Sequence, residues 1–174
     1  ILMERLAEDA ERLGELRDFI GQGGEHKVNV VEDKENKGAK FRDYFDHVEP
    51  LKKVPSHRAL AILRGRNEGV LTYSIVVGDA EDDRRQPHPA EQRIAARWHI
   101  RDNGRAADRW LSEVVRWTWR VKLSTQIETD LMAQVREAAE TEAINVFAAN
   151  LKDLLLLAPA GPRATLGLDP GLRT

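Results

Sequence analysis

The longest helical pattern in the chain is QIETDLMAQVREAAETEAINVFAANLKDLLLL, which covers residues 126–157. Apolar residues recur in it at steps of three or four, beginning with Ile127, Leu131 and Val135, and this period places them along one face of a helix. Pro159 lies two residues after the end of this stretch, and proline cannot continue a helix because it lacks the backbone N–H. The stretch therefore predicts one long helix that contributes to the core of a mainly α-helical fold.

The stretch just upstream, RAADRWLSEVVRWTWRVK at residues 105–122, has a second helical pattern. Its apolar residues share one broad face of the predicted helix: Trp110, Leu111, Val114, Val115, Trp117 and Val121. Trp119 lies away from this face, so we expect the helix to be buried on more than one side. Tryptophans at helical spacing among Leu and Val are typical of a core. The alternative is that the four tryptophans of the chain, Trp98, Trp110, Trp117 and Trp119, stack on bases.

Four further helical patterns precede these two, over residues 1–20, 39–46, 56–64 and 90–100. Residues 21–38 are polar and flanked by glycine, which is typical of a loop. We expect the helices at 1–20 and 90–100 to pack against the apolar faces of the two long ones. The predicted fold class is mainly α, a multi-helix, bundle-like segment.

A small β element is predicted beside the helices. VLTYSIVV at residues 70–77 is the best strand candidate, because it is rich in β-branched and aromatic residues and follows Gly69. One strand cannot stand alone, and the plausible partners are residues 27–31 and 165–168. We also expect a truncated strand at residues 164–168.

The composition excludes several classes of site. The chain has 174 residues and no Cys, so it has no disulfide framework, thiolate zinc site or Cys nucleophile. Its five His are scattered without the paired spacing of metal ligands, and it has no phosphate-binding glycine loop. We therefore expect no cofactor. The longest apolar run, residues 154–158, is far shorter than the roughly 20 residues that a membrane helix needs.

Positive charge is concentrated in the middle of the chain, where residues 51–125 carry 15 Lys and Arg against 9 Asp and Glu. Seven arginines follow one another there, mostly at steps of four: Arg93, Arg97, Arg101, Arg105, Arg109, Arg116 and Arg120. On one uninterrupted helix the first five would form a stripe that tracks phosphates. We expect Asn103-Gly104 to break that alignment. Nearby acidic residues can pair with the arginines, so a salt-bridged, solvated face is the favoured interpretation and nucleic-acid binding the alternative.

Asp169 ends the apolar stretch at residues 164–168 and precedes Pro170-Gly171. A carboxylate at the end of a strand can hold a divalent metal together with further acidic residues. Asp-Pro-Gly is also the composition of an ordinary turn, which is the favoured interpretation. One carboxylate cannot form such a metal site by itself.

Four long phrases of the sequence are distinctive. They are GAKFRDYFD at residues 38–46, VPSHRALAILRGRNEGVLT at 54–72, WLSEVVRWTWRVKLS at 110–124 and FAANLKDLLLLAPAGPRATLGLDPGLRT at 147–174. Together they resemble the Tex family of bacterial transcription accessory proteins. The resemblance covers most of the chain.

The resemblance implies a place in a large, cytoplasmic, multidomain protein that binds nucleic acid. In that family a helical N-terminal region precedes a YqgF-type, RNase H-like domain, helix-hairpin-helix modules and an oligonucleotide-binding barrel. It implies three parts in this chain: the end of an N-terminal helical subregion (1–50), a helical domain with a short β element (51–158), and a linker with the truncated first strand of the YqgF-type domain (159–174). Asp169 would then occupy the place of the first catalytic carboxylate of that superfamily, in an incomplete site.

We therefore expect a helical scaffold and interaction segment without catalytic activity of its own. The expected partners are nucleic acid, through the full-length parent, other domains of the same protein and the transcription machinery, and no membrane. The chain begins with Ile rather than Met, which fits a piece of a longer protein. Two alternatives stay open: part of a metal-dependent nuclease with Asp169 as its first carboxylate, and an autonomous nucleic-acid-binding module that uses the basic block at residues 93–122.

Overall fold

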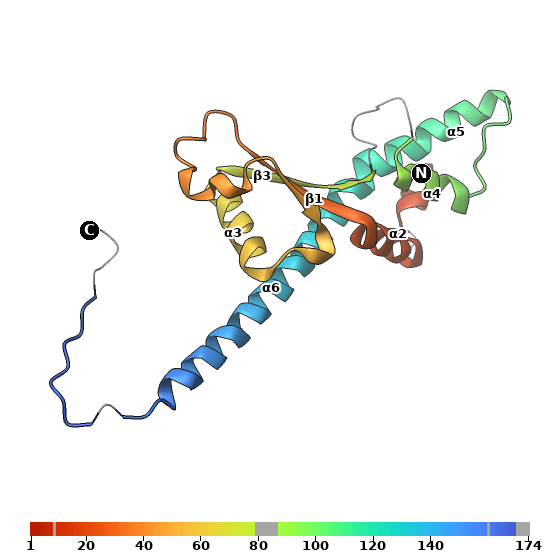
Figure 1. Cartoon of the computed structure of the whole chain (residues 1–174). Helices are drawn as coiled ribbons and strands as arrows, with labels where there is room; N and C mark the ends of the chain where they lie inside the picture. Colours follow the sequence, from red (N-terminus) through yellow and green to blue (C-terminus); the bar gives the residue numbers. More distant parts are fainter. Residues whose placement is uncertain (9, 79–86, 160, 170–174) are drawn as a thin grey trace. The chain divides into compact units, whose positions relative to one another are not determined.

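A computed structural model of the chain describes residues 1–8, 10–78, 87–159 and 161–169. It divides into two compact units, residues 1–143 and 144–174. The elements in chain order are α1 (Leu2–Ala7), α2 (Ala10–Gly23), β1 (Gly24–Val30), the 3-10 helix η1 (Ala39–Tyr44), β2 (His47–Pro50), the 3-10 helix η2 (Leu51–Lys53), α3 (Ser56–Asn67), β3 (Leu71–Val77), α4 (Pro89–Arg97), α5 (Ala106–Trp117), the π-helix η4 (Thr118–Leu123) and α6 (Ser124–Leu155) (Figure 1). The fold is mainly α with one small sheet, as the sequence predicts.

The sheet has three antiparallel strands in the order β2-β1-β3. The predicted strand at residues 70–77 is β3, and its partner is β1, with Val28 opposite Tyr73. Of the two candidate partners, the one at residues 27–31 is therefore confirmed. The prediction of a loop over residues 21–38 is wrong for β1, because the buried side chains of His26 and Val28 alternate with more exposed neighbours in a stretch that is polar overall.

The predicted strand at residues 164–168 is absent from the described structure, where this segment has no regular secondary structure. An extended segment becomes a strand only when a neighbouring strand pairs with it, and the only sheet among the described residues consists of β1, β2 and β3.

Three of the predicted helices differ in detail from the observed ones. The single helix expected over residues 1–20 is divided into α1 and α2, and the backbone N–H of Glu8 closes α1 by donating to the carbonyl of Glu4. The two long helices expected at 105–122 and 126–157 are joined without a break by η4. At the start of η4, the hydroxyl of Thr118 donates to the carbonyl of Val114 in α5 at 2.7 Å.

The first unit has two clusters of buried apolar side chains. The larger one joins α2, α4, α5, η4 and α6, and its members include Ile20, Ile94, Trp119 and Ile127. The smaller one lies between the sheet, η1 and α3, with Ile62 fully buried in it. This second cluster needs a glycine on α3, because a Cβ at position 65 would lie 2.5 Å from the side chain of Leu71.

The described apolar side chains of the second unit are exposed, and they include Ile144, Phe147, Leu154 and Leu155 of the last turns of α6. Within the described ranges, no helix combines the length and the apolarity that a membrane span requires.

Candidate functional site

The arginines predicted as a basic face do not lie on one helix. Arg93 and Arg97 belong to α4, Arg101 lies in the connection after it, and α5 begins only at Ala106. Gly104 has a positive φ of 77°, a backbone conformation that glycine adopts more readily than other residues. The expected break at Asn103-Gly104 is therefore confirmed, and a continuous stripe of five arginines does not form.

Arg105 stabilises the start of α5 through hydrogen bonds to Asp108. Its Nε donates to Asp108 at 3.1 Å, while the backbone N–H groups of Asn103 and Arg105 donate to the same carboxylate at 2.8 and 3.1 Å. Asp108 is only 1% exposed. The hydrogen bond from Arg105, followed by that from Asn103, lowers the pKa of the Asp108 carboxyl to about 2. This arrangement satisfies donors that the first turn of a helix leaves unpaired, so Arg105 and Asp108 have a structural role.

Most of the other arginines also have partners within the fold. Three ion pairs join them to carboxylates, at Arg97–Glu15 (4.0 Å), Arg116–Glu113 (3.7 Å) and Arg120–Glu91 (3.4 Å). The guanidinium carbon of Arg93 lies 3.7 Å from the ring centroid of Phe19, a cation–π contact. Within the described part of the chain, Arg101 and Arg109 have no ion pair. A salt-bridged face thus accounts for much of the basic block.

The tryptophans divide into two groups. Trp119 is buried and stacks on the ring of His88, with centroids 4.9 Å apart, while Trp98 is half-buried. Trp110 and Trp117 are 59% and 56% exposed. The prediction that Trp110 and Trp117 belong to the core is therefore wrong. The opposite side of α5, with Val115, is the buried one, because it packs toward α1 and α4.

The exposed side of α5 combines aromatic and basic side chains in two rows. Trp110 and Trp117 are seven residues apart, so they lie on the same side of the helix about 10 Å from each other. Arg109 and Arg116 precede them by one residue each and form a parallel row on the adjacent side. We call these four residues the α5 face. Bases can stack on such rings while guanidinium groups bind phosphates.

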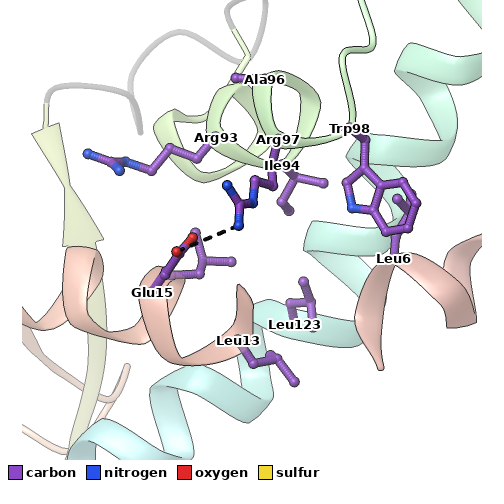
Figure 2. A pocket seen from close by; sticks show the side chains of 10 residues that line it. Leu6, Leu13, Glu15, Arg93, Ile94, Ala96, Arg97, Trp98 and Leu123 are labelled. Carbon is purple, nitrogen blue, oxygen red and sulfur yellow. Dashed lines mark ion pairs between the residues drawn. The ribbon is translucent and has the colours of Figure 1, made fainter. Parts of the chain in front are cut away.

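A second feature of the first unit is a pocket of about 330 Å³ between α1, α2, α4 and η4 (Figure 2). Its walls are mainly apolar side chains: Leu6, Leu13, Leu16, Ile94, Trp98 and Leu123. Arg97 reaches across from α4 towards Glu15 of α2, as the dashed line in Figure 2 shows. No pattern in the sequence indicates this pocket, because its residues come from four elements that are separate in the chain.

Asp169 lies in the second unit, and Pro170 and Gly171 are outside the described residues. Among the residues that the structure describes, no group of three or more His, Asp or Glu side chains is arranged to hold a metal ion. The role of Asp169 as the first carboxylate of a metal site stays a prediction.

The comparisons with a family model and with individual known proteins point to one family. A family model described as "Tex central region-like" matches residues 1–147. Protein YhgF of Escherichia coli is 56% identical over 174 residues, and the transcriptional accessory protein Tex of Neisseria gonorrhoeae is 51% identical over 173 residues. These matches cover 100% and 99% of this chain but 22% of each relative. The human "S1 RNA-binding domain-containing protein 1" is 26% identical over 180 residues, which are 99% of this chain and 18% of that protein.

Proposed function

Since the chain belongs to the Tex central region-like family, we propose that it is a helical scaffold segment of a transcription accessory protein and that its α5 face binds single-stranded nucleic acid. The observation that carries the proposal is the exposure of Trp110 and Trp117 in a row beside Arg109 and Arg116. An aromatic side chain that is more than half exposed contributes less to the stability of the folded segment than a buried one would. Its exposure is therefore better explained by a partner that it contacts.

Single-stranded nucleic acid suits this face better than a duplex. In a duplex both faces of a base are covered by the neighbouring base pairs, whereas a single strand can leave a face open to stack on an indole ring. Positive charge for the phosphates comes from Arg109 and Arg116. Arg109 has no ion pair among the described residues. The human relative's name includes RNA binding, which supports nucleic acid as the partner class. The remaining arginines of the predicted set, Arg93, Arg97, Arg101, Arg105 and Arg120, are secondary or structural in this proposal.

The test is fluorescence anisotropy of a labelled single-stranded RNA titrated with the chain. Loss of one stacked base corresponds to about 1–3 kcal/mol, so Trp117→Ala should weaken binding by about 5- to 150-fold, whereas Trp117→Phe should retain most of it. Arg109→Ala should reduce the slope of log K against log salt by about 0.7. The matched control is Arg42→Ala, which removes an exposed arginine from η1. Equal affinities of the wild type and Trp117→Ala would refute the proposal.

We propose that this segment has no catalytic activity of its own. Phosphoryl transfer by metal ions needs several acidic side chains that share the ions, and among the described residues no group of three or more His, Asp or Glu side chains is arranged to hold one. The check is incubation with Mg²⁺ and single-stranded or branched DNA. Cleavage that disappears in Asp169→Asn would show that the segment is part of a nuclease instead.

A further inference from the structure

The pocket between α1, α2, α4 and η4 has the characteristics of a site for one bulky apolar side chain. Its volume of about 330 Å³ is at the small end of the range for ligand sites. The walls are carbon-rich, with Leu13 and Leu16 contributed by α2 and Ile94 by α4. A nucleobase would bring several hydrogen-bonding groups into these walls, and leaving such groups unpaired is costly. An aliphatic or phenyl side chain has no such groups.

The charge at the mouth of the pocket indicates what accompanies that side chain. Arg97 and Glu15 line the pocket and are 52% and 59% exposed, which places them at its mouth, and Arg97 Nη2 is 4.0 Å from Glu15 Oε1 (Figure 2). That distance is well beyond the roughly 2.7–2.9 Å of a strong guanidinium–carboxylate hydrogen bond. Arg97 is half-exposed, so it retains N–H donors for a second carboxylate. Arg93 also lines the pocket, but its guanidinium lies over the ring of Phe19 and points away from the Arg97–Glu15 pair in Figure 2. Arg97 is therefore the described cation of this lining that is placed to pair with a partner's carboxylate.

From this combination we propose that the pocket binds an acidic protein segment, which inserts a leucine or phenylalanine side chain between α2 and α4 while a neighbouring carboxylate pairs with Arg97. A single aromatic or aliphatic anchor in a desolvated pocket commonly dominates the affinity of such an interface. Flanking acidic residues speed association and select the partner. This site is separate from the α5 face, and its function does not depend on nucleic-acid binding.

The test uses a fluorescein-labelled peptide, Asp-Glu-Glu-Leu-Phe-Glu-Asp, and fluorescence anisotropy with the whole chain. Two control peptides separate the contributions: one has Ser in place of Leu and Phe, and the other has Lys in place of every acidic residue. We expect saturable binding of the first peptide only. Equal binding of the serine peptide would overturn the proposal, because it would show that charge alone is recognised, and so would the absence of binding.

Two protein variants locate the site. Arg97→Glu, at an exposed position, should weaken binding at least about tenfold, and Leu13→Gln should do the same by making a wall polar. Arg42→Glu changes the net charge of the chain equally at a site outside the pocket and should leave affinity unchanged. Thermal unfolding by circular dichroism confirms that each variant is folded. Unchanged affinity of folded Arg97→Glu, or displacement of the peptide by unlabelled single-stranded RNA, would contradict the assignment.

Discussion

Acidification should destabilise the first unit through His26, which is fully buried on the central strand β1. Both of its ring nitrogens lack a hydrogen-bond partner among the described residues. Burial lowers the pKa of His26 to about 4 from its usual 6.5, a shift that the nearby carboxylate of Glu49 opposes and that His47 reinforces. The folded protein therefore holds this imidazole neutral at pH values where the unfolded chain already binds a proton.

The sign and the size of the effect follow from this difference in pKa. The unfolded chain binds more protons between pH 6.5 and 4, so stability rises with pH in that window and is complete above about pH 6.5. Each tenfold change in proton affinity corresponds to about 1.4 kcal/mol. The contribution of His26 should thus fall by about 3 kcal/mol between pH 8 and pH 4.

The assay is urea unfolding followed by circular dichroism at a series of pH values. His26→Phe should remove this part of the pH dependence, because phenylalanine has a similar shape and binds no proton, and the free energy of unfolding at pH 8 should be maintained or increased. The quantity to compare is the difference in the free energy of unfolding between wild type and variant at each pH, because this difference cancels the titration of the other ionisable groups. A control, His57→Gln, removes an exposed imidazole from α3. Parallel pH profiles for the wild type and His26→Phe would refute the reasoning.

Three further perturbations test the fold. Asp108→Ala removes the carboxylate that binds the start of α5, so it should lower the thermal midpoint and accelerate hydrogen exchange at the amides of Asn103 and Arg105. Gly65→Ala should destabilise by about 1–3 kcal/mol, because its Cβ would overlap the side chain of Leu71, whereas Gly14→Ala meets no atom within 4 Å and should stabilise α2 by up to about 1 kcal/mol. Denaturant titrations measure the free energy of unfolding of the two glycine variants. A stabilising Gly65→Ala together with a destabilising Gly14→Ala would contradict the packing described for Gly65.

Much of the fold could be predicted from local pattern. The apolar period of residues 126–157 and the β-branched run at residues 70–77 give α6 and β3 to within two residues at each end. β1 is harder to predict from the sequence, since its residues, GEHKVNV, include few of the types that strands favour. It forms because it lies between two partners that supply its backbone hydrogen bonds. A pairing of this kind depends on residues far away in the chain.

The candidate sites show the same division. The mainly helical fold class, the concentration of arginines in the middle block and the resemblance to a family can all be read from the order of residue types. The exposure of Trp110 and Trp117 and the burial of Trp119 depend on the folded arrangement. So does the pocket that Leu13 and Ile94 line together. A helix with apolar residues on several sides buries the side that its neighbours cover, and the packing of the whole unit determines which neighbours those are.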